Sequence, residues 1–273
     1  MKKILVPIDF SPCAGNALEY ALHIAARSGM EITALHVIFP NDGINNNMYD
    51  AFWIDDYIDQ RDKDLKEWSE KIAAQCDRSN VPMQFVCNMG FPVSTIAETA
   101  ASLQASLIIM GTTGATGLKG ILLGSTAGGV IGNTQVPVLT VPPEATFKTQ
   151  SHFVLATDFT FKPDQKSHHA LSMLLKAHEA HLNVLHVLPE DGTPPVEKEK
   201  NVSAHLTDID HHFHYIHDKD VVNAIDNFME STEAGILADV AHKHSVIHQV
   251  FFRSISRALA GRLHVPTLIL HDA

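Results

Sequence analysis

Cysteines, basic residues and long apolar runs are all scarce in this chain of 273 residues. Its three cysteines, Cys13, Cys76 and Cys87, include no CxxC pair and cannot build a paired disulfide framework. Lysine and arginine number 20 against 31 acidic residues, and the net charge of −11 argues against a nucleic-acid-binding protein with a basic face. No run of about 18 uncharged apolar residues exists, and the N-terminal apolar stretch is too short for a signal peptide. We therefore expect a cytoplasmic protein in a reducing compartment, with neither membrane nor nucleic acid among its partners.

Three short apolar segments occur twice along the chain, in the same order. The pairs are ILVPIDF (4–10) with FVLATDF (153–159), ITALHVI (32–38) with LNVLHVL (182–188), and VPVLTV (136–141) with VPTLIL (265–270). The second pair is offset by 150 residues and the third by 129, so the second copy lacks 21 residues, which we place between its second and third strands. Such an ordered recurrence predicts a tandem duplication.

A polar, proline-containing segment separates the two copies. Pro142-Pro143 follows the last apolar segment of the first copy, and residues before a proline favour extended geometry. We therefore predict a first domain at 1–143, a linker at 144–150 and a second domain at 151–273.

Each half alternates strand-length apolar runs with helix-length segments. In the first half we predict a helix at 13–29 and a charged helix from about 55 to 78, which follows an irregular stretch at 41–53; the strands are expected at 3–9, 31–38, 83–89, 106–111 and 136–141. Alternation of this kind predicts an α/β fold, with two tandem open parallel sheets of about five strands each. Ligands of such sheets bind beyond the carboxyl ends of the strands.

A glycine-rich loop follows the predicted fourth strand of the first half. It reads GTTGATGLKGILLGS (111–125) and leads into a helical run. Glycines allow the backbone to approach a ligand closely, and the N–H groups at a helix start suit phosphate. The loop fits neither the Walker A pattern nor the Rossmann GxGxxG pattern. Because ordinary turns also need glycine, the loop alone leaves open both phosphate binding and a plain turn.

The spacing of this loop resembles the nucleotide-binding signature of the universal stress protein family, G-x-x-G, nine residues, G-[S/T]. Gly111, Gly114, Gly124 and Ser125 supply it. The segments ILVPIDFS, LHVI, IIMG and VPVLTV are similar to that family's landmarks, in the family's order. The resemblance covers the whole first half and, more faintly, the second. It implies an adenine nucleotide alpha hydrolase-like fold for both halves, packed as a pseudo-dimer through their last strands, VPVLTV and VPTLIL.

The same resemblance implies an ATP site in the first half. Asp9 would contact the adenosine, with Pro7 and Ile8 along that edge, and Val37 would meet adenine through its backbone. Gly111 would approach the ribose. Two alternatives remain open, namely that Asp9 is only an acceptor at a helix N-terminus and that Val37 is only a core residue.

The phosphates would be held without a lysine, by backbone amides and hydroxyls, and a divalent ion, Mg or Mn, would bridge them. The resemblance assigns this role to Thr113, Gly114, Gly124, Ser125 and Thr126. Relatives often carry histidine where this chain has Thr113. The alternative is that the glycines are inherited turns without a ligand.

No catalytic residues are evident beside this loop. There is no Ser/His/Asp grouping and no acid pair, and bound phosphates alone do not position a water. We interpret ATP as a regulatory ligand of a stress-response protein that is at most a slow ATPase.

In the second half the glycines of the loop are replaced. The offset of 129 places Val240, Lys243 and Arg253 where the first half has Gly111, Gly114 and Gly124. Bulky side chains disfavour the backbone geometry of the loop, so we predict that this half does not bind ATP in the same way. The basic residues Lys243, His244 and Arg253 either hold a different anion, form a solvated face or contact the first half.

Histidines are concentrated in the second half, which holds sixteen of the 18. In HLTDIDHHFHYIHD (205–218), His212 and His214 would share a strand face, a workable pair for zinc. The third strand of this half is expected at 213–217, with His214 in the position of Phe85. Two other functions therefore stay open: a nucleotide-free scaffold with an unidentified protein partner, and a histidine-based metal or pH sensor. The association of two chains into a homodimer is also left open.

Overall fold

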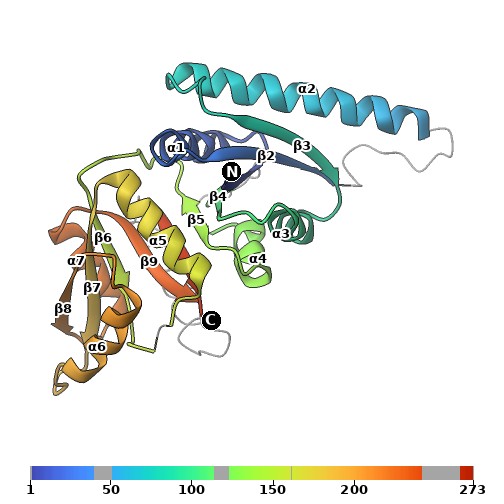
Figure 1. The fold of residues 1–273 in the computed structure, drawn as a ribbon. Coiled ribbons are helices and arrows are strands. Elements are labelled where there is room, and N and C mark those ends of the chain that lie inside the picture. The colour runs from blue at the N-terminus through green and yellow to red at the C-terminus, as the bar shows by residue number, and fades with distance from the viewer. Residues whose placement is uncertain (1, 40–50, 114–122, 161, 242–264, 273) are drawn as a thin grey trace.

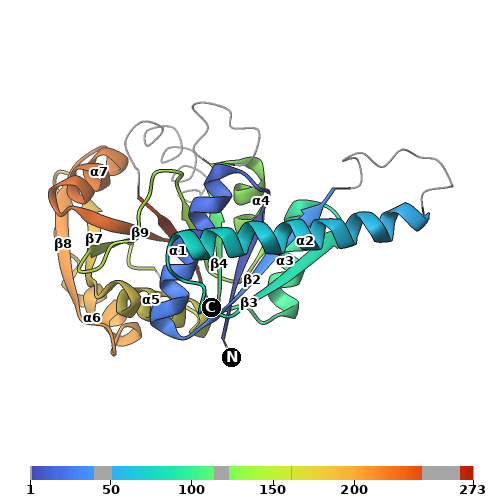
Figure 2. The same ribbon diagram turned by 90° about the horizontal axis from the view of Figure 1, so that it is seen from above.

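The computed structural model describes residues 2–39, 51–113, 123–160, 162–241 and 265–272. In the first half the elements are β1 (Lys3–Ile8), α1 (Pro12–Ser28), β2 (Glu31–Ile38), α2 (Ala51–Gln75), β3 (Met83–Met89), α3 (Pro92–Ser102), β4 (Leu107–Gly111), α4 (Ser125–Asn133) and β5 (Val138–Val141). In the second half they are β6 (His152–Ala156), α5 (Gln165–His178), β7 (His181–Leu188), α6 (Val196–His205), β8 (His211–His217), α7 (Val221–Ser231), β9 (Ala234–Ala241) and β10 (Thr267–His271). Figures 1 and 2 show the two halves side by side, the first coloured blue to green and the second yellow to red.

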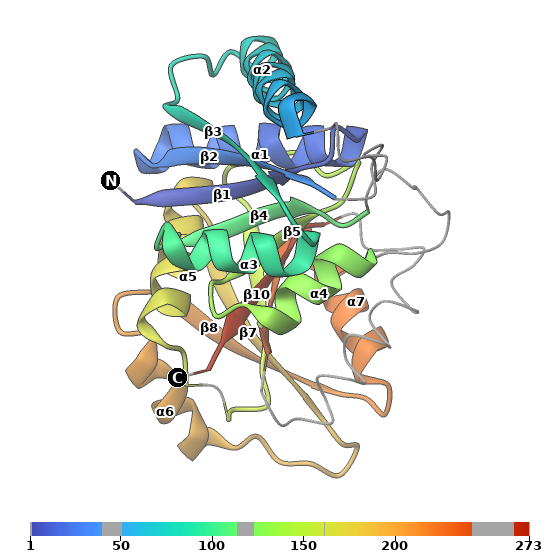
Figure 3. The same ribbon diagram turned by 90° about the vertical axis from the view of Figure 1, so that its right-hand side faces the viewer.

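All ten strands of the described chain join one sheet, in the order β3-β2-β1-β4-β5-β10-β9-β6-β7-β8. The strands of each half pair in parallel. Among the described strands, only the central pair, β5 and β10 (both labelled in Figure 3), is antiparallel. In this pair Leu139 lies opposite Leu268. The predicted α/β fold is therefore confirmed, as is the pseudo-dimer built through the last strand of each half.

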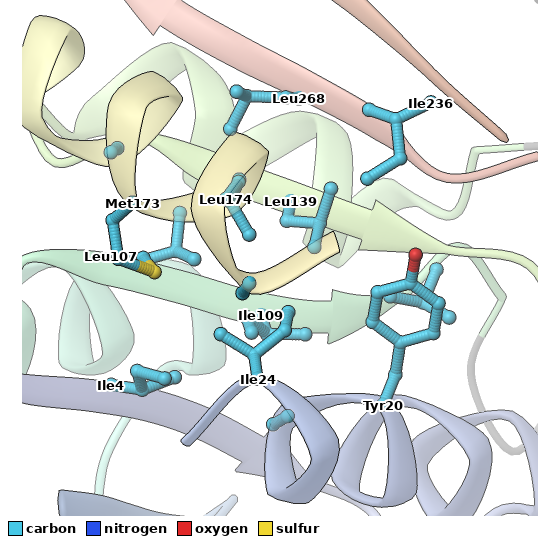
Figure 4. Close-up of a cluster of buried hydrophobic side chains, with 14 of the residues drawn as sticks. Ile4, Tyr20, Ile24, Leu107, Ile109, Leu139, Met173, Leu174, Ile236 and Leu268 are labelled. Carbon is cyan, nitrogen blue, oxygen red and sulfur yellow. The ribbon is translucent and has the colours of Figure 1, made fainter. Parts of the chain in front are cut away.

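Helices cover both faces of this sheet. On one face, α1, α2 and α5 enclose a core that continues from the first half into the second. Met173 and Leu174 of α5 and Ile24 of α1 lie over the strands on both sides of the junction (Figure 4). On the other face, α3 and α4 pack together over the first half, and α7 covers the second. Strands buried on both faces explain the continuous apolar runs of the sequence.

Polar contacts join α1 to α5 beside this core. His178 is 1% exposed; its Nδ1 donates to the Lys148 carbonyl at 2.7 Å, and its Nε2 lies 3.3 Å from the Tyr20 hydroxyl. Burial lowers the pKa of His178 to about 4; the Lys148 carbonyl opposes this shift, and Arg27 adds to it. Arg27 also forms an ion pair with Glu179. The two halves are thus held by hydrogen bonds as well as by apolar packing.

Both ends of α1 are defined by local capping residues. The Ser11 hydroxyl caps the helix by accepting from the Ala14 amide at 3.1 Å, and Pro12 occupies the first turn. Gly29 ends the helix with a φ of 66°, a left-handed conformation that glycine adopts without strain. These caps place the N-terminus of α1 directly after β1.

The predicted element bounds hold for β2 and β3 and differ elsewhere. The charged helix begins earlier than expected, at Ala51, so the irregular stretch predicted at 41–53 overlaps α2. The strand expected at 213–217 begins at His211. No helix in the described ranges has the length and apolar character needed to cross a membrane.

The alignment of β8 with β3 needs a correction. Ala34 pairs with Phe85 in the first half, and its counterpart Val184 pairs with Phe213. Phe213, rather than His214, is therefore the counterpart of Phe85, and β8 lies one residue earlier than the offset of 129 predicts. A one-residue shift moves every side chain of a strand to the opposite face.

Candidate functional site

A cavity of about 200 Å³ lies at the carboxyl ends of the first-half strands β1, β2 and β4. β1 stands between β2 and β4 in the sheet, so the strand order reverses there. This is the position at which open α/β sheets bind their ligands.

Nine of the ten predicted site residues line this cavity. They are Pro7, Ile8, Asp9, Val37, Gly111, Thr113, Gly124, Ser125 and Thr126. The tenth, Gly114, lies outside the described residues. The structure thus brings together residues from four separate segments of the sequence.

Several lining residues were not predicted. Leu35, Pro92, Ile96 and Met110 form apolar walls, and His36 lies beside the predicted Val37. Pro92 and Ile96 belong to α3, whose approach to the cavity depends on the crossover after β3. The histidine did carry a signal, because the LHV triplet recurs in both halves at 35–37 and 185–187.

Asp9 occupies a tight turn between β1 and α1. Its Oδ1 accepts a hydrogen bond from the Ser11 amide at 3.0 Å. Asp9 therefore does act as an acceptor near the start of α1, which was the alternative to a ligand contact. Its carboxylate nevertheless lies at the exposed rim of the cavity. The following residue, Phe10, has a φ of 62°, which is unusual for a residue other than glycine.

The start of α4 forms the other end of the cavity. The Gly124 amide donates to the Thr112 carbonyl at 2.6 Å, which fixes the helix start against the end of β4. No side chain caps α4. The amides of its first turn have no partner within the helix and, together with the helix dipole, favour an anion at this position.

Gly111 is needed for packing as well as for any approach to a ligand. A Cβ at Gly111 would lie 2.8 Å from Cys13 Sγ and 3.2 Å from the Cys13 carbonyl carbon, both in the first turn of α1. Glycine therefore lets α1 begin close against β4, and Ala14 of the same turn lines the cavity.

The second half keeps the aspartate turn and changes its surroundings. Asp158 Oδ1 accepts from the Thr160 amide at 2.9 Å, and Phe159 has a φ of 65°. Strand pairing confirms Val240 as the counterpart of Gly111, because Val240 pairs with Leu270 as Gly111 pairs with Val141.

The helix after this second turn also starts later. α5 has 14 residues against 17 in α1, and it begins only at Gln165, after the Asp164 cap. The preceding segment instead contacts the end of β10, where the Lys162 amide donates to Asp272 Oδ1 at 3.2 Å. Val240 is buried, at 5% exposed. Lys243, His244 and Arg253 lie outside the described residues.

His214 of β8 has partners within the fold. The His214 ring lies 5.0 Å from that of Phe228, and its Nε2 lies 2.9 Å from Asn183 Oδ1. Burial and the neighbouring His212 lower the pKa of His214. Within the residues that the structure describes, no group of three His, Cys, Asp or Glu side chains is arranged to hold a metal ion.

Comparison with known proteins agrees with this fold. A universal stress protein of Methanocaldococcus jannaschii is 34% identical over 141 residues, which are 51% of this chain and 81% of that protein. The crystal structure of a universal stress protein from Archaeoglobus fulgidus covers 99% of this chain and 98% of its own, with a TM-score of 0.72 and 23% identity. A structure of a putative universal stress protein from Pseudomonas aeruginosa covers 100% and 94%, with a TM-score of 0.61 and 15% identity. The universal stress protein family profile matches residues 1–142, and the chain belongs to that family.

Proposed function

We propose that this protein binds ATP in the first-half cavity as a regulatory ligand, with little or no hydrolysis. One observation carries the proposal: residues that the family signature relates to nucleotide binding come from four segments and line one cavity at the point where the strand order reverses. An ordinary set of turns would not need to converge in this way.

The two ends of the cavity suit the two ends of a nucleotide. Apolar walls from Leu35, Ile96 and Met110 suit a base, and the Asp9 carboxylate can accept from a hydroxyl or an amine of adenosine. At the other end, the first amides of α4 and the hydroxyls of Ser125 and Thr126 are donors suited to phosphate oxygens. We assign Gly114, which lies outside the described residues, to the phosphate loop from its place in the signature.

The phosphate end also fits a divalent ion held mainly by the nucleotide. The lining includes no lysine or arginine among the described residues, so amides, hydroxyls and a cation must balance the phosphate charge. Mg or Mn takes oxygen ligands, and most of them would come from phosphate and water. The hydroxyls of Thr113, Ser125 and Thr126 would supply the rest.

The lining offers little for hydrolysis. Among the described lining residues, the ionisable side chains are those of Asp9 and His36. Asp9 belongs to the adenosine end assigned above, and His36 Nδ1 faces the Ile8 carbonyl at 2.8 Å, so neither is assigned to the phosphate end. A regulatory ligand is therefore favoured over a rapidly hydrolysed substrate.

We assign the site to a domain at 1–143, followed by a linker at 144–150 and a second domain at 151–273 with a structural or regulatory role. Val240 and the late start of α5 support a second half that does not bind ATP in the same way. The three free cysteines are consistent with a reducing compartment. We infer a cytoplasmic, stress-responsive protein that acts through a protein partner.

The test is a titration of the nucleotide-free protein with ATP and Mg by calorimetry, together with chromatography of the nucleotide extracted from purified protein. We expect one site per chain. Thr126→Val removes a hydroxyl from the lining while keeping the side-chain shape, and should weaken binding about tenfold. Thr207→Val, an exposed threonine of the second half, is the matched control.

Each result has a clear meaning. No binding at saturation would refute the ATP site and favour a nucleotide-free scaffold. Two nucleotides per chain would show that the second half also binds. Equal affinity of the Thr126→Val variant and the wild type would contradict the assigned phosphate end.

A further inference from the structure

We propose that His36 is a positioning residue for this site, which acts on the ligand through Asp9. The inference rests on the proposed function and adds a residue that neither the loop signature nor the predicted adenosine edge includes. It is carried by a unit of three side chains, those of Asp9, Phe10 and His36, which we name the aspartate-turn unit.

His36 holds the peptide that enters this turn. Its Nδ1 lies 2.8 Å from the Ile8 carbonyl oxygen, and a neutral imidazole donates to that oxygen from Nδ1. The Ile8 carbonyl belongs to the same planar peptide unit as the Asp9 amide. Fixing the oxygen therefore fixes the orientation of the peptide plane from which the Asp9 side chain departs.

His36 also supports the strained residue that follows. The centroid of the Phe10 ring lies 4.8 Å from that of the His36 ring and 5.6 Å from that of the Trp68 ring of α2. These contacts hold Phe10 at a φ of 62°, a conformation that persists only when its surroundings enforce it. His36 thus constrains both neighbours of Asp9 in the chain: Ile8 through the hydrogen bond from Nδ1, and Phe10 through the ring contact.

The second half contains the same unit beside a changed site. His186 Nδ1 lies 2.7 Å from the Thr157 carbonyl, and its ring lies 4.8 Å from that of Phe159, which has a φ of 65°. Val240 stands in place of the glycine there. The unit therefore forms without the surroundings of the first-half cavity, and the second copy provides a control for its purely structural contribution.

The experiment compares His36→Phe, which keeps an aromatic ring but loses the donor, with His36→Asn, which keeps a donor at the position of Nδ1. His186→Phe is the matched control in the second half. Each full-length variant is measured for its dissociation constant for ATP with Mg and for its urea midpoint. A double-mutant cycle then adds His36→Phe to Asp9→Ala.

We expect His36→Phe to weaken ATP binding about tenfold and His36→Asn to recover most of that loss. His186→Phe should lower the urea midpoint by a similar amount and leave the ATP affinity unchanged. In the Asp9→Ala background, His36→Phe should have little further effect, because its route to the ligand is already absent.

Three results would overturn the inference while the proposed function stood: unchanged affinity in His36→Phe, equal losses in His36→Phe and His186→Phe, or independent, multiplying effects of His36→Phe and Asp9→Ala. Absence of ATP binding in the wild type would instead refute the proposed function, and the inference would fall with it.

Discussion

Gly111 and Cys13 are in such close contact that the first turn of α1 lies against the end of β4 only because Gly111 has no side chain. A Cβ there would stand 2.8 Å from Cys13 Sγ. We expect Gly111→Ala to displace the start of α1, to lower the free energy of unfolding by about 1–3 kcal/mol and to weaken nucleotide binding. Urea unfolding and calorimetric titration measure the two effects.

Gly132→Ala is the matched control for this substitution. Gly132 lies in α4, and an added Cβ would meet no atom within 4 Å. Because alanine has a higher helix propensity than glycine, this variant should be more stable than the wild type by about 0.5–1 kcal/mol. Equal stability changes in the two variants would contradict the packing role of Gly111.

The antiparallel junction predicts a large cost for truncating Leu268. This side chain is fully buried opposite Leu139, in the core shared by the two halves. Leu268→Ala should lower the free energy of unfolding by about 2–5 kcal/mol, measured by urea denaturation. Val196→Ala, at a position 58% exposed, should change it by less than about 0.5 kcal/mol. Similar effects of the two substitutions would show that the junction contributes little.

His178 predicts an acid-sensitive contact between α1 and α5. Its pKa falls from an ordinary value of 6.5 to about 4 because burial disfavours the cation. As the pH falls from 6.5 to 4, the unfolded chain binds a proton that native His178 does not, so stability decreases across this window. The shift corresponds to about 3 kcal/mol in the free energy of unfolding. This stability is fully present above pH 6.5 and is lost as the pH falls through 4.

Urea unfolding at several pH values tests this prediction. His178→Gln removes the titrating group, so its loss of stability between pH 7 and pH 4 should be smaller than that of the wild type. His205→Gln, which removes an exposed histidine, controls for loss of an imidazole. A His178→Gln variant with the wild-type dependence on pH would refute the assignment.

Cys87 should react slowly with alkylating reagents. Burial, together with the hydrogen-bonded carboxylate of Asp62, raises the pKa of its thiol to about 12. Because the thiolate is the reactive form, we expect alkylation by iodoacetamide at pH 8.5 to be at least about tenfold slower than for a free thiol. Peptide mass spectrometry follows the reaction, and Asp62→Asn should accelerate it. Reaction of native Cys87 at the rate seen in urea would contradict this expectation.

The strands of the first half were predictable because burial on both faces leaves a continuous apolar run. β2, which is mostly buried, occupies the predicted position 31–38. β3 also occupies its predicted position, 83–89, although it is a partly exposed edge strand. The register of β8 was not predictable from its sequence, HHFHYIH. Histidines and aromatic residues on a partly exposed edge strand tolerate either face, so the apolar pattern does not select one register.

In the candidate site, too, some residues were predictable from the sequence and others were not. The loop signature and the aspartate turn are each a continuous stretch of sequence, so each could be recognised in advance. Their described residues line one cavity. The walls from Pro92 and Ile96 depend on how α3 crosses the sheet, which no local pattern reports. The contact between Gly111 and Cys13 likewise depends on where α1 begins relative to β4, so glycine's packing role was not visible in the sequence.

The pairing of β5 with β10 joins strands of the same polypeptide, and this has a consequence for mass action. A symmetric dimer formed through such strands would separate on dilution below its dissociation constant. Here the covalent connection makes the encounter of β5 and β10 unimolecular, with an effective concentration set by the chain itself. The ten-stranded sheet should therefore stay assembled on dilution, and another chain would have to compete with the tethered partner for that strand.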